Sequence, residues 1–112
     1  MAKSIDAGAL RRRITIQKKS LKTDDYGDKT EGDWGDVCSV WACIDAIGAR
    51  EFWEAQAAHG ELTHRVTIRY REGITADMRI LYGERKFDLV APPVDQEERH
   101  RYLILKCREV TT

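Results

Sequence analysis

The chain has 112 residues, the length of a single domain with one modest core, and we expect residues 1–112 to form it. Lysine and arginine number 19, and aspartate and glutamate also number 19, so the formal net charge is zero. This balance argues against bulk electrostatic attraction to nucleic acid or to an anionic membrane. No apolar run approaches the roughly 20 residues that span a bilayer, and the N-terminus lacks the apolar region of a secretory signal. We therefore expect a soluble protein, made in a cytoplasm, that does not contact a membrane.

The N-terminal third of the chain predicts one strand and a long loop. Residues 4–12 predict a short turn or helix, and the first strand follows from Arg13 to Lys18. Residues 19–36 are polar, contain three glycines and show no apolar period, which predicts a loop or a hairpin tip. The later part of this segment has Lys29 as its only counter-charge, so it forms an acidic patch. Its acidic residues are Asp24, Asp25, Asp28, Glu31, Asp33 and Asp36.

The middle of the chain predicts a buried strand followed by a short helix. The segment from Val37 to Ile47 is apolar on both faces, which favours a central strand or one that crosses between two layers, with Trp41 in the core. Gly48 ends it, and residues 49–59 change to a helical period with Gly60 as a stop. A helix of about three turns is marginal without tertiary support, so we expect this segment to order on assembly.

The stretch from Leu62 to Arg71 alternates without interruption. One face carries Leu62, His64, Val66, Ile68 and Tyr70. The other face carries Thr63, Arg65, Thr67, Arg69 and Arg71. A period of two is typical of a half-buried antiparallel strand, so this strand is predicted to be apolar inside and cationic outside.

The C-terminal part predicts a hairpin and a last strand. Met78, Ile80 and Tyr82 share a face, residues 83–85 form a turn, and the chain returns from Lys86 to Val90. A charged loop leads to the strand from Arg101 to Val110. The chain is therefore predicted to be mainly β, a small antiparallel β-barrel or sandwich of about six strands with one short inserted α-helix and a long acidic loop.

Enzyme and metal signatures are absent from the sequence. It has no GxSxG, Walker, Rossmann, HExxH or EF-hand pattern, and we predict neither catalytic residues nor a metal or cofactor site. Cys38, Cys43 and Cys107 show neither CxxC spacing nor nearby histidines, which favours reduced thiols over a disulfide or a zinc site.

The cationic face comprises Arg65, Arg69 and Arg71, with Arg11, Arg12 and Arg13. It has three interpretations: a groove for nucleic acid, an interface with the acidic loop of a neighbouring subunit, or a solvated surface. Zero net charge favours the interface over the groove. A chain that is acidic on one patch and basic on another suits head-to-tail association, which closes into a ring when the rotation allows it. Trp34 and Trp53 are expected at loop or subunit contacts, with base stacking as the alternative.

The order of several segments resembles the phage head–tail joining family of long-tailed phages, whose members are also called head–tail adaptors, stoppers or head completion proteins. These segments are LRRRITIQ, the glycine- and aspartate-rich loop with Trp34, VWACIDAIGAREFWEAQ and HRVTIRYREGITADMRILYGERKFDL. The resemblance implies a small β-barrel in the virion neck and a structural role instead of an enzymatic one. Copies would form a ring that joins the head to the tail and, in some members, closes the DNA channel.

The resemblance also implies site residues and partners. The channel-lining or stopper segment would comprise Ile47, Gly48, Arg50, Glu51, Phe52, Trp53, Ala55 and Gln56. The subunit interface would comprise Arg65, Arg69, Arg71, Asp24, Asp25, Asp28 and Trp34. Expected partners are other copies of the chain, a portal or adaptor ring, a tail completion or tail tube protein, and DNA in the lumen, with a monomer as the free form. The residues leave open whether the protein gates the channel or only joins two rings, and a small nucleic-acid-binding barrel is the alternative function.

Overall fold

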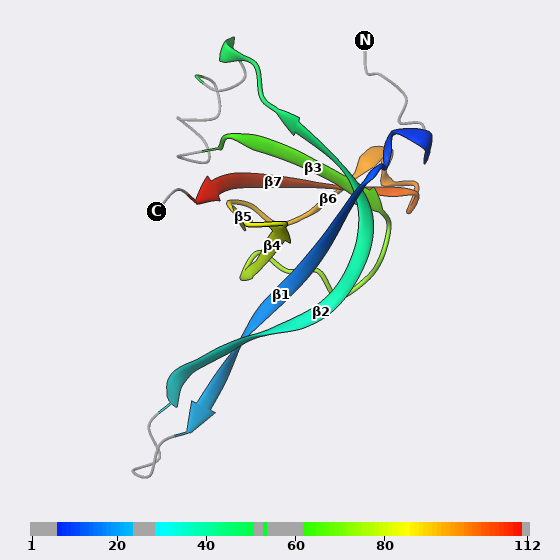
Figure 1. Cartoon of the computed structure of the whole chain (residues 1–112). Coiled ribbons are helices and arrows are strands. Elements are labelled where there is room, and N and C mark those ends of the chain that lie inside the picture. The colour runs from blue at the N-terminus through cyan, green and yellow to red at the C-terminus, as the bar shows by residue number, and fades with distance from the viewer. Residues whose placement is uncertain (1–6, 24–28, 51–52, 54–61, 111–112) are drawn as a thin grey trace.

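The strands of this chain close into a barrel. The computed structural model describes residues 7–23, 29–50, 53 and 62–110. Its strands are β1 (Arg12–Thr23), β2 (Lys29–Ala46), β3 (His64–Arg69), β4 (Met78–Tyr82), β5 (Arg85–Leu89), β6 (Val94–Asp95) and β7 (Tyr102–Val110), with short 3-10 helices η1 (Ala7–Ala9) and η2 (Gln96–Glu98). Antiparallel neighbours follow the order β3-β2-β1-β4-β5-β7, and β3 pairs with β7 to close the circle (Figure 1). The predicted mainly β fold and its barrel are confirmed.

The strand β7 holds the C-terminal half of the barrel together. Along one edge it pairs with β3, from His64 opposite Cys107 to Arg69 opposite Tyr102. Its other edge is divided between the short outer strand β6, near Ile104, and β5. The last strand in sequence therefore contacts three others, and the barrel closes only when it is in place.

The core follows the alternation of the strands, because successive side chains point to opposite faces of a sheet. The largest fully buried side chains come from five strands: Phe87, Ile14, Ile16, Ile68, Ile80, Leu105, Val66 and Cys107. The alternation predicted for residues 62–71 is present, with Leu62, Val66 and Ile68 buried. Thr67, on the opposite face, is also buried at 5% exposure, so this face is not uniformly a solvated cationic surface.

The hairpin from β4 to β5 is the element that the sequence predicts most closely. Tyr82 pairs with Arg85 across a turn at Gly83 and Glu84. Gly83 has a φ of +59°, a left-handed conformation that glycine adopts without steric cost. The hairpin is confirmed, with a turn one residue shorter than predicted and a returning strand, β5, that begins and ends one residue earlier.

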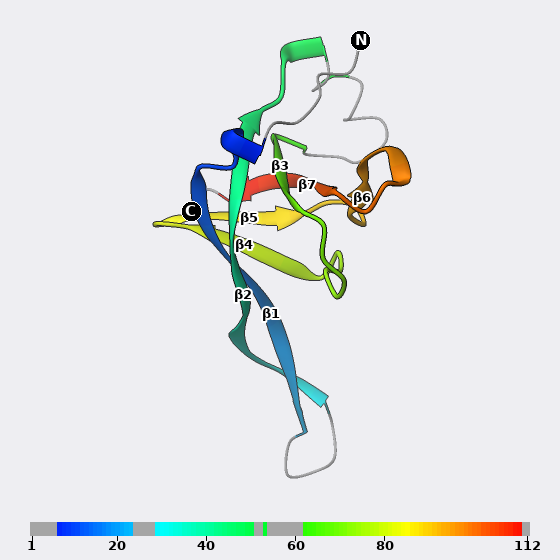
Figure 2. The same ribbon diagram turned by 90° about the vertical axis from the view of Figure 1, so that its right-hand side faces the viewer.

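The prediction of a loop at residues 19–36 is wrong for residues 19–23 and 29–36, which belong to β1 and β2. These two strands continue beyond the barrel as a two-stranded ribbon (Figure 2). Thr23 still pairs with Lys29, and the register shifts after Ile16 and again after Lys19, which are irregularities that increase strand twist. A ribbon held by main-chain hydrogen bonds needs no buried face and so no apolar period. Residues 24–28 lie outside the described residues.

The inserted segment between β2 and β3 is described only in part. Ala49, Arg50 and Trp53 are helical, as predicted, and the remaining residues of the expected helix at 49–59 lie outside the described residues. The chain leaves and re-enters the barrel at a fixed place. The N–H of Ile47 donates to the carbonyl of Thr63 (3.1 Å), and the N–H of Thr63 donates to the carbonyl of Cys107 (2.9 Å).

Candidate interaction surface

A large aromatic side chain is exposed in the middle of the sheet. Trp41 lies on β2, where it pairs with Arg13 of β1, and the pairing of β2 with β3 begins at the next residue, Ala42. It is 52% exposed, whereas the adjacent Ala42 is fully buried. The prediction that Trp41 belongs to the core is wrong. Its face of the strand is apolar, but it is the outer face of the barrel.

An arginine covers one side of this tryptophan. Arg13 of β1 is directly opposite Trp41 in the register, and its guanidinium carbon lies 5.3 Å from the centroid of the indole ring. A cation over an aromatic face contributes about 0.5–1 kcal/mol at an exposed site. This contact orients Arg13 along the outer surface of the sheet.

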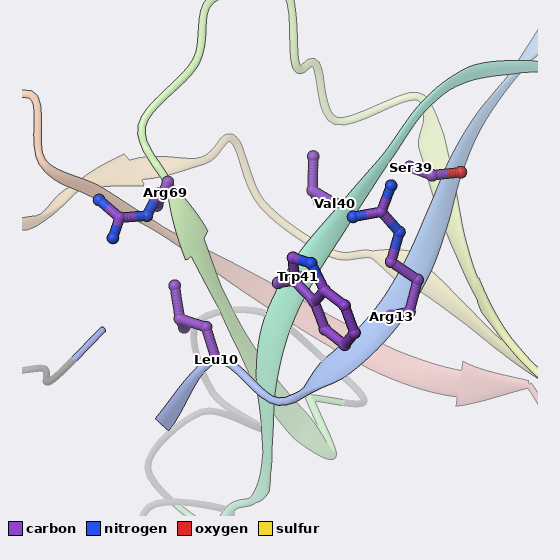
Figure 3. Close-up of a pocket in the computed structure, with 6 residues that line it drawn as sticks. All are labelled: Leu10, Arg13, Ser39, Val40, Trp41 and Arg69. Carbon is purple, nitrogen blue, oxygen red and sulfur yellow. The ribbon is translucent and has the colours of Figure 1, made fainter. Parts of the chain in front are cut away.

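Trp41 borders a surface pocket of about 380 Å³ (Figure 3). The pocket is lined by Leu10, Arg13, Ser39, Val40, Trp41 and Arg69, and we call it the Trp41 pocket. Leu10, just before β1, is only 8% exposed. In Figure 3, Arg13 and Arg69 lie on opposite sides of Leu10 and Trp41. The pocket thus combines an apolar floor with a cation at each side.

The three arginines predicted for the subunit interface have different surroundings. Arg69 is exposed and lines the Trp41 pocket. Arg65 is half-buried and stands between Asp45 of β2 and Lys106 of β7 in the register. Arg71 is exposed, two residues beyond the end of β3. Of these three arginines, only Arg69 therefore contributes to the pocket, together with Arg13 of the predicted cationic face.

Trp34, also predicted for the interface, packs against cations of its own chain. The guanidinium carbon of Arg79 lies 4.1 Å from its ring centroid, and the ammonium of Lys19 lies 5.7 Å away. Arg79 Nε donates to Gln17 Oε1 (2.9 Å), and Gln17 Nε2 donates to Asp36 Oδ1 (2.7 Å). This network links β4, β1 and β2 on the outer face where the ribbon leaves the barrel.

The predicted stopper segment is only partly within the described residues. Ile47 is half-buried at the exit from the barrel, Gly48 and Arg50 are exposed, and Trp53 is 72% exposed. Glu51, Phe52, Ala55 and Gln56 lie outside the described residues, as do Asp24, Asp25 and Asp28 of the predicted interface.

A polar cluster joins the ends of three strands. Arg85 Nε donates to Glu109 Oε2 (2.8 Å), and the ring of His64 lies edge-on to Phe87 with centroids 5.2 Å apart. The hydrogen bond from Arg85 lowers the pKa of Glu109. Burial lowers the pKa of His64, while the charge of Glu109 acts in the opposite direction. This cluster fixes β3, β5 and β7 to one another.

The sequence pattern did not indicate two further features. Tyr70 stacks on His100, with centroids 4.4 Å apart and planes 3° from parallel, and Asp95 accepts the main-chain N–H of His100 (3.0 Å). The sequence predicts Leu10 only as part of a turn or helix, although this residue lines the Trp41 pocket. The sequence feature that indicates the pocket is the presence of an arginine on each of two strands near Trp41: Arg13 on β1 and Arg69 on β3.

The described residues offer little reactive chemistry. Burial raises the pKa of the Cys107 thiol to about 12, so this thiol is protonated at neutral pH. Among the described residues, no cluster of three or more His, Cys, Asp or Glu side chains is arranged to hold a metal ion. In the same part of the chain, no helix has the length and apolar character needed to cross a bilayer.

Comparison with known proteins identifies the family. The phage head completion protein family matches residues 5–110. The fold is similar to the solution structure of protein SF1141 from Shigella flexneri 2a, with 30% identity, a TM-score of 0.78, and coverage of 94% of this chain and 96% of that chain. It is also similar to a chain of the virion of a native gene transfer agent particle, with 19% identity, a TM-score of 0.64, and coverage of 92% of this chain and 97% of that chain. A comparison with curated proteins finds no match. Because the family match spans nearly its whole length, this chain belongs to the phage head completion protein family, whose members are structural proteins of the virion.

Proposed function

We propose that this protein forms a ring in the neck of the virion, where it joins the portal or adaptor ring of the head to a tail completion or tail tube protein. One observation carries the proposal: a member of the head completion family leaves Trp41 half exposed between two arginines, on a strand of the closed sheet. Tryptophan and arginine dominate the energetics of protein interfaces. Such a surface on a single chain is suited to burial against another subunit.

The ring would be held by contacts between different surfaces of neighbouring copies. The basic side chains of Arg65, Arg69 and Arg71 would face the acidic residues Asp24, Asp25 and Asp28 together with Trp34. The zero net charge of the chain supports this arrangement, since each copy carries both signs. Heterologous contacts of this kind generate a closed ring when the rotation per subunit allows it.

The inserted segment from Ile47 to Gln56 would point toward the lumen of the ring and contact or retain DNA. Its support is the exposure of Trp53 and Arg50 on a segment whose two ends are fixed to the barrel near Ile47 and Thr63. Replacing Trp53 with Ala tests the retention role. We expect filled heads whose DNA becomes sensitive to nuclease, and full protection in that variant would contradict retention.

We propose that the free protein, made in the host cytoplasm, is a monomer and that the portal or adaptor ring acts as a template for assembly. Ordering segments on assembly costs conformational entropy, which a preformed partner ring offsets through added contacts. Light scattering of the purified protein alone and with portal complexes tests this. A stable ring without any partner would contradict templating but not the joining function.

Deletion of the gene is the direct test of joining. We expect filled heads that fail to attach tails, with tailed particles restored by the wild-type gene supplied separately. Normally tailed, infectious particles without the gene would refute the proposal. Titration with oligonucleotides at several salt concentrations separates joining from nucleic-acid binding, since phosphate neutralisation gives a steep salt dependence that we do not expect here.

A further inference from the structure

We propose that the Trp41 pocket receives the acidic segment at residues 24–28 of a second copy of this chain. The inference rests on the proposed ring and deepens it by assigning the contact between neighbours to one pocket and one occupant. It differs from a general pairing of basic and acidic faces, because the predicted arginines Arg65 and Arg71 lie outside the pocket, whereas Leu10, Arg13 and Trp41 are part of it.

The pocket has the chemistry of a carboxylate site with an apolar floor. Within the described residues, neither Arg13 nor Arg69 has an ion-pair partner, and the contact of the Arg13 guanidinium carbon with the Trp41 ring, at 5.3 Å, involves no carboxylate. The N–H edges of both groups are therefore available for carboxylates, which guanidinium binds in a two-pronged geometry. Leu10, Val40 and the indole of Trp41 provide the surface between them.

The segment between β1 and β2 carries the complementary groups. Its sequence is Asp24-Asp25-Tyr26-Gly27-Asp28, which places three carboxylates around one aromatic side chain. The carboxylates match the two guanidinium groups, and the ring of Tyr26 matches an apolar floor that includes a tryptophan. A pocket of about 380 Å³ lies within the range of roughly 300–1,000 Å³ in which proteins bind compact groups.

The segment of the same molecule cannot reach the pocket. Arg13 and Thr23 are separated by ten residues of β1, which at about 3.3 Å per residue is a distance of roughly 33 Å. Thr23 is paired with Lys29, so the chain of five residues that connects them starts and ends at the same end of the ribbon. At about 3.5 Å per residue their chain is about 20 Å long, and its reach is only about 10 Å. The contact is therefore between two molecules.

This geometry has a structural consequence. The molecule measures 55 Å by 29 Å by 28 Å, and the end of the ribbon, where Thr23 pairs with Lys29, projects away from the barrel (Figures 1 and 2). Each copy would donate its segment to one neighbour and accept that of another. A phosphate backbone would also attract the two arginines, but the apolar floor and the zero net charge favour a peptide.

Photo-crosslinking in assembled particles identifies the occupant. With p-benzoylphenylalanine in place of Trp41, we expect a crosslinked dimer of this chain whose linked peptide contains residues 24–28. The same probe in place of Val94, which is 43% exposed on the outer strand β6, serves as the control and should not give this dimer. A crosslink from position 41 to another protein or to nucleic acid, or no crosslink in tailed particles, would overturn the assignment.

A charge exchange tests the energetic role of the same contact. Arg13→Glu with Arg69→Glu should lower the yield of tailed particles by about 100-fold, since opposing like charges strongly disfavours an interface. Replacing Asp24, Asp25 and Asp28 with Lys should lower the yield of tailed particles by a similar factor. A chain that carries both the arginine and the aspartate substitutions should recover most of the wild-type yield.

The control and the outcomes separate this inference from the proposed ring. Lys86→Glu with Arg99→Glu reverses two exposed charges outside the pocket and should leave the yield unchanged. Normal tailing by each reversed set would refute the pocket contact and the proposed pairing of basic and acidic side chains between neighbours, but not the joining function. Normal tailing in the absence of the gene would instead refute the joining function. If a reversed variant fails to fold, as judged by circular dichroism, the crosslinked peptide decides.

Discussion

Replacing Phe87 with Ala should remove a large part of the stability of the barrel. Phe87 is fully buried on β5, its ring meets the edge of His64, and the guanidinium carbon of Arg85 lies 5.0 Å from its centroid. Truncation of a buried phenylalanine costs about 3–5 kcal/mol. Here β5 is paired with both β4 and β7, which limits collapse of the cavity, so we expect a loss of about 4 kcal/mol.

This loss is a large part of the roughly 5–15 kcal/mol that stabilises an average domain, and it corresponds to a fall in melting temperature of about 15–20 °C. Urea unfolding followed by circular dichroism measures it. Phe87→Leu keeps most of the volume and should cost less than about 1.5 kcal/mol. If Phe87→Ala cost no more than Phe87→Leu, the reasoning that this side chain is the centre of a rigid core would be refuted.

Three further predictions concern protonation, assembly and thiol reactivity. Burial lowers the pKa of His64 below its ordinary 6.5, so the unfolded chain binds this proton more readily, and stability should fall as the pH drops below about 6.5. His64→Gln should reduce that fall in urea midpoints measured across pH 5 to 8. Trp41→Ala should lower the unfolding free energy by only about 1–2 kcal/mol, because the side chain is half exposed, yet it should block tail attachment in a complementation assay. Iodoacetamide should label Cys38 and Cys43 in the folded protein but Cys107 only after unfolding, as read by mass spectrometry, because Cys107 is buried with a pKa of about 12. Rapid labelling of native Cys107, or a Trp41→Ala variant that attaches tails normally, would contradict these expectations.

The strands with one buried face were predictable from the sequence. Residues 62–71 and the β4–β5 hairpin alternate because one face packs on the core, and burial imposes a period of two on the side chains. The ribbon at residues 19–23 and 29–36 was not predictable in this way. Its strands are stabilised by pairing with each other instead of by a buried face, so the sequence carries no such period.

The candidate site was predicted only in part, for a related reason. Alternation assigns Trp41 and Ala42 to opposite faces, but it does not say which face lies inside a closed barrel. That choice depends on the closing contact between β3 and β7, which joins parts of the chain about 40 residues apart. Arg69 was predicted to be functional from its face of the strand. Leu10 was not, because no periodic pattern connects it to a strand 30 residues away.

The hydrogen bond between Ile47 and Thr63 allows the sequence of the insert to vary without a change in the barrel. The two ends of the insert are joined at the barrel wall, so the 15 residues from Gly48 to Leu62 close a loop whose entropic cost rises by only about 0.6 kcal/mol for each doubling of length. Homologous proteins can therefore lengthen, shorten or recode this segment while retaining the same core. The width and chemistry of the passage through a ring would then be adjustable by replacement of this one segment, with no change in the way that the subunits fold.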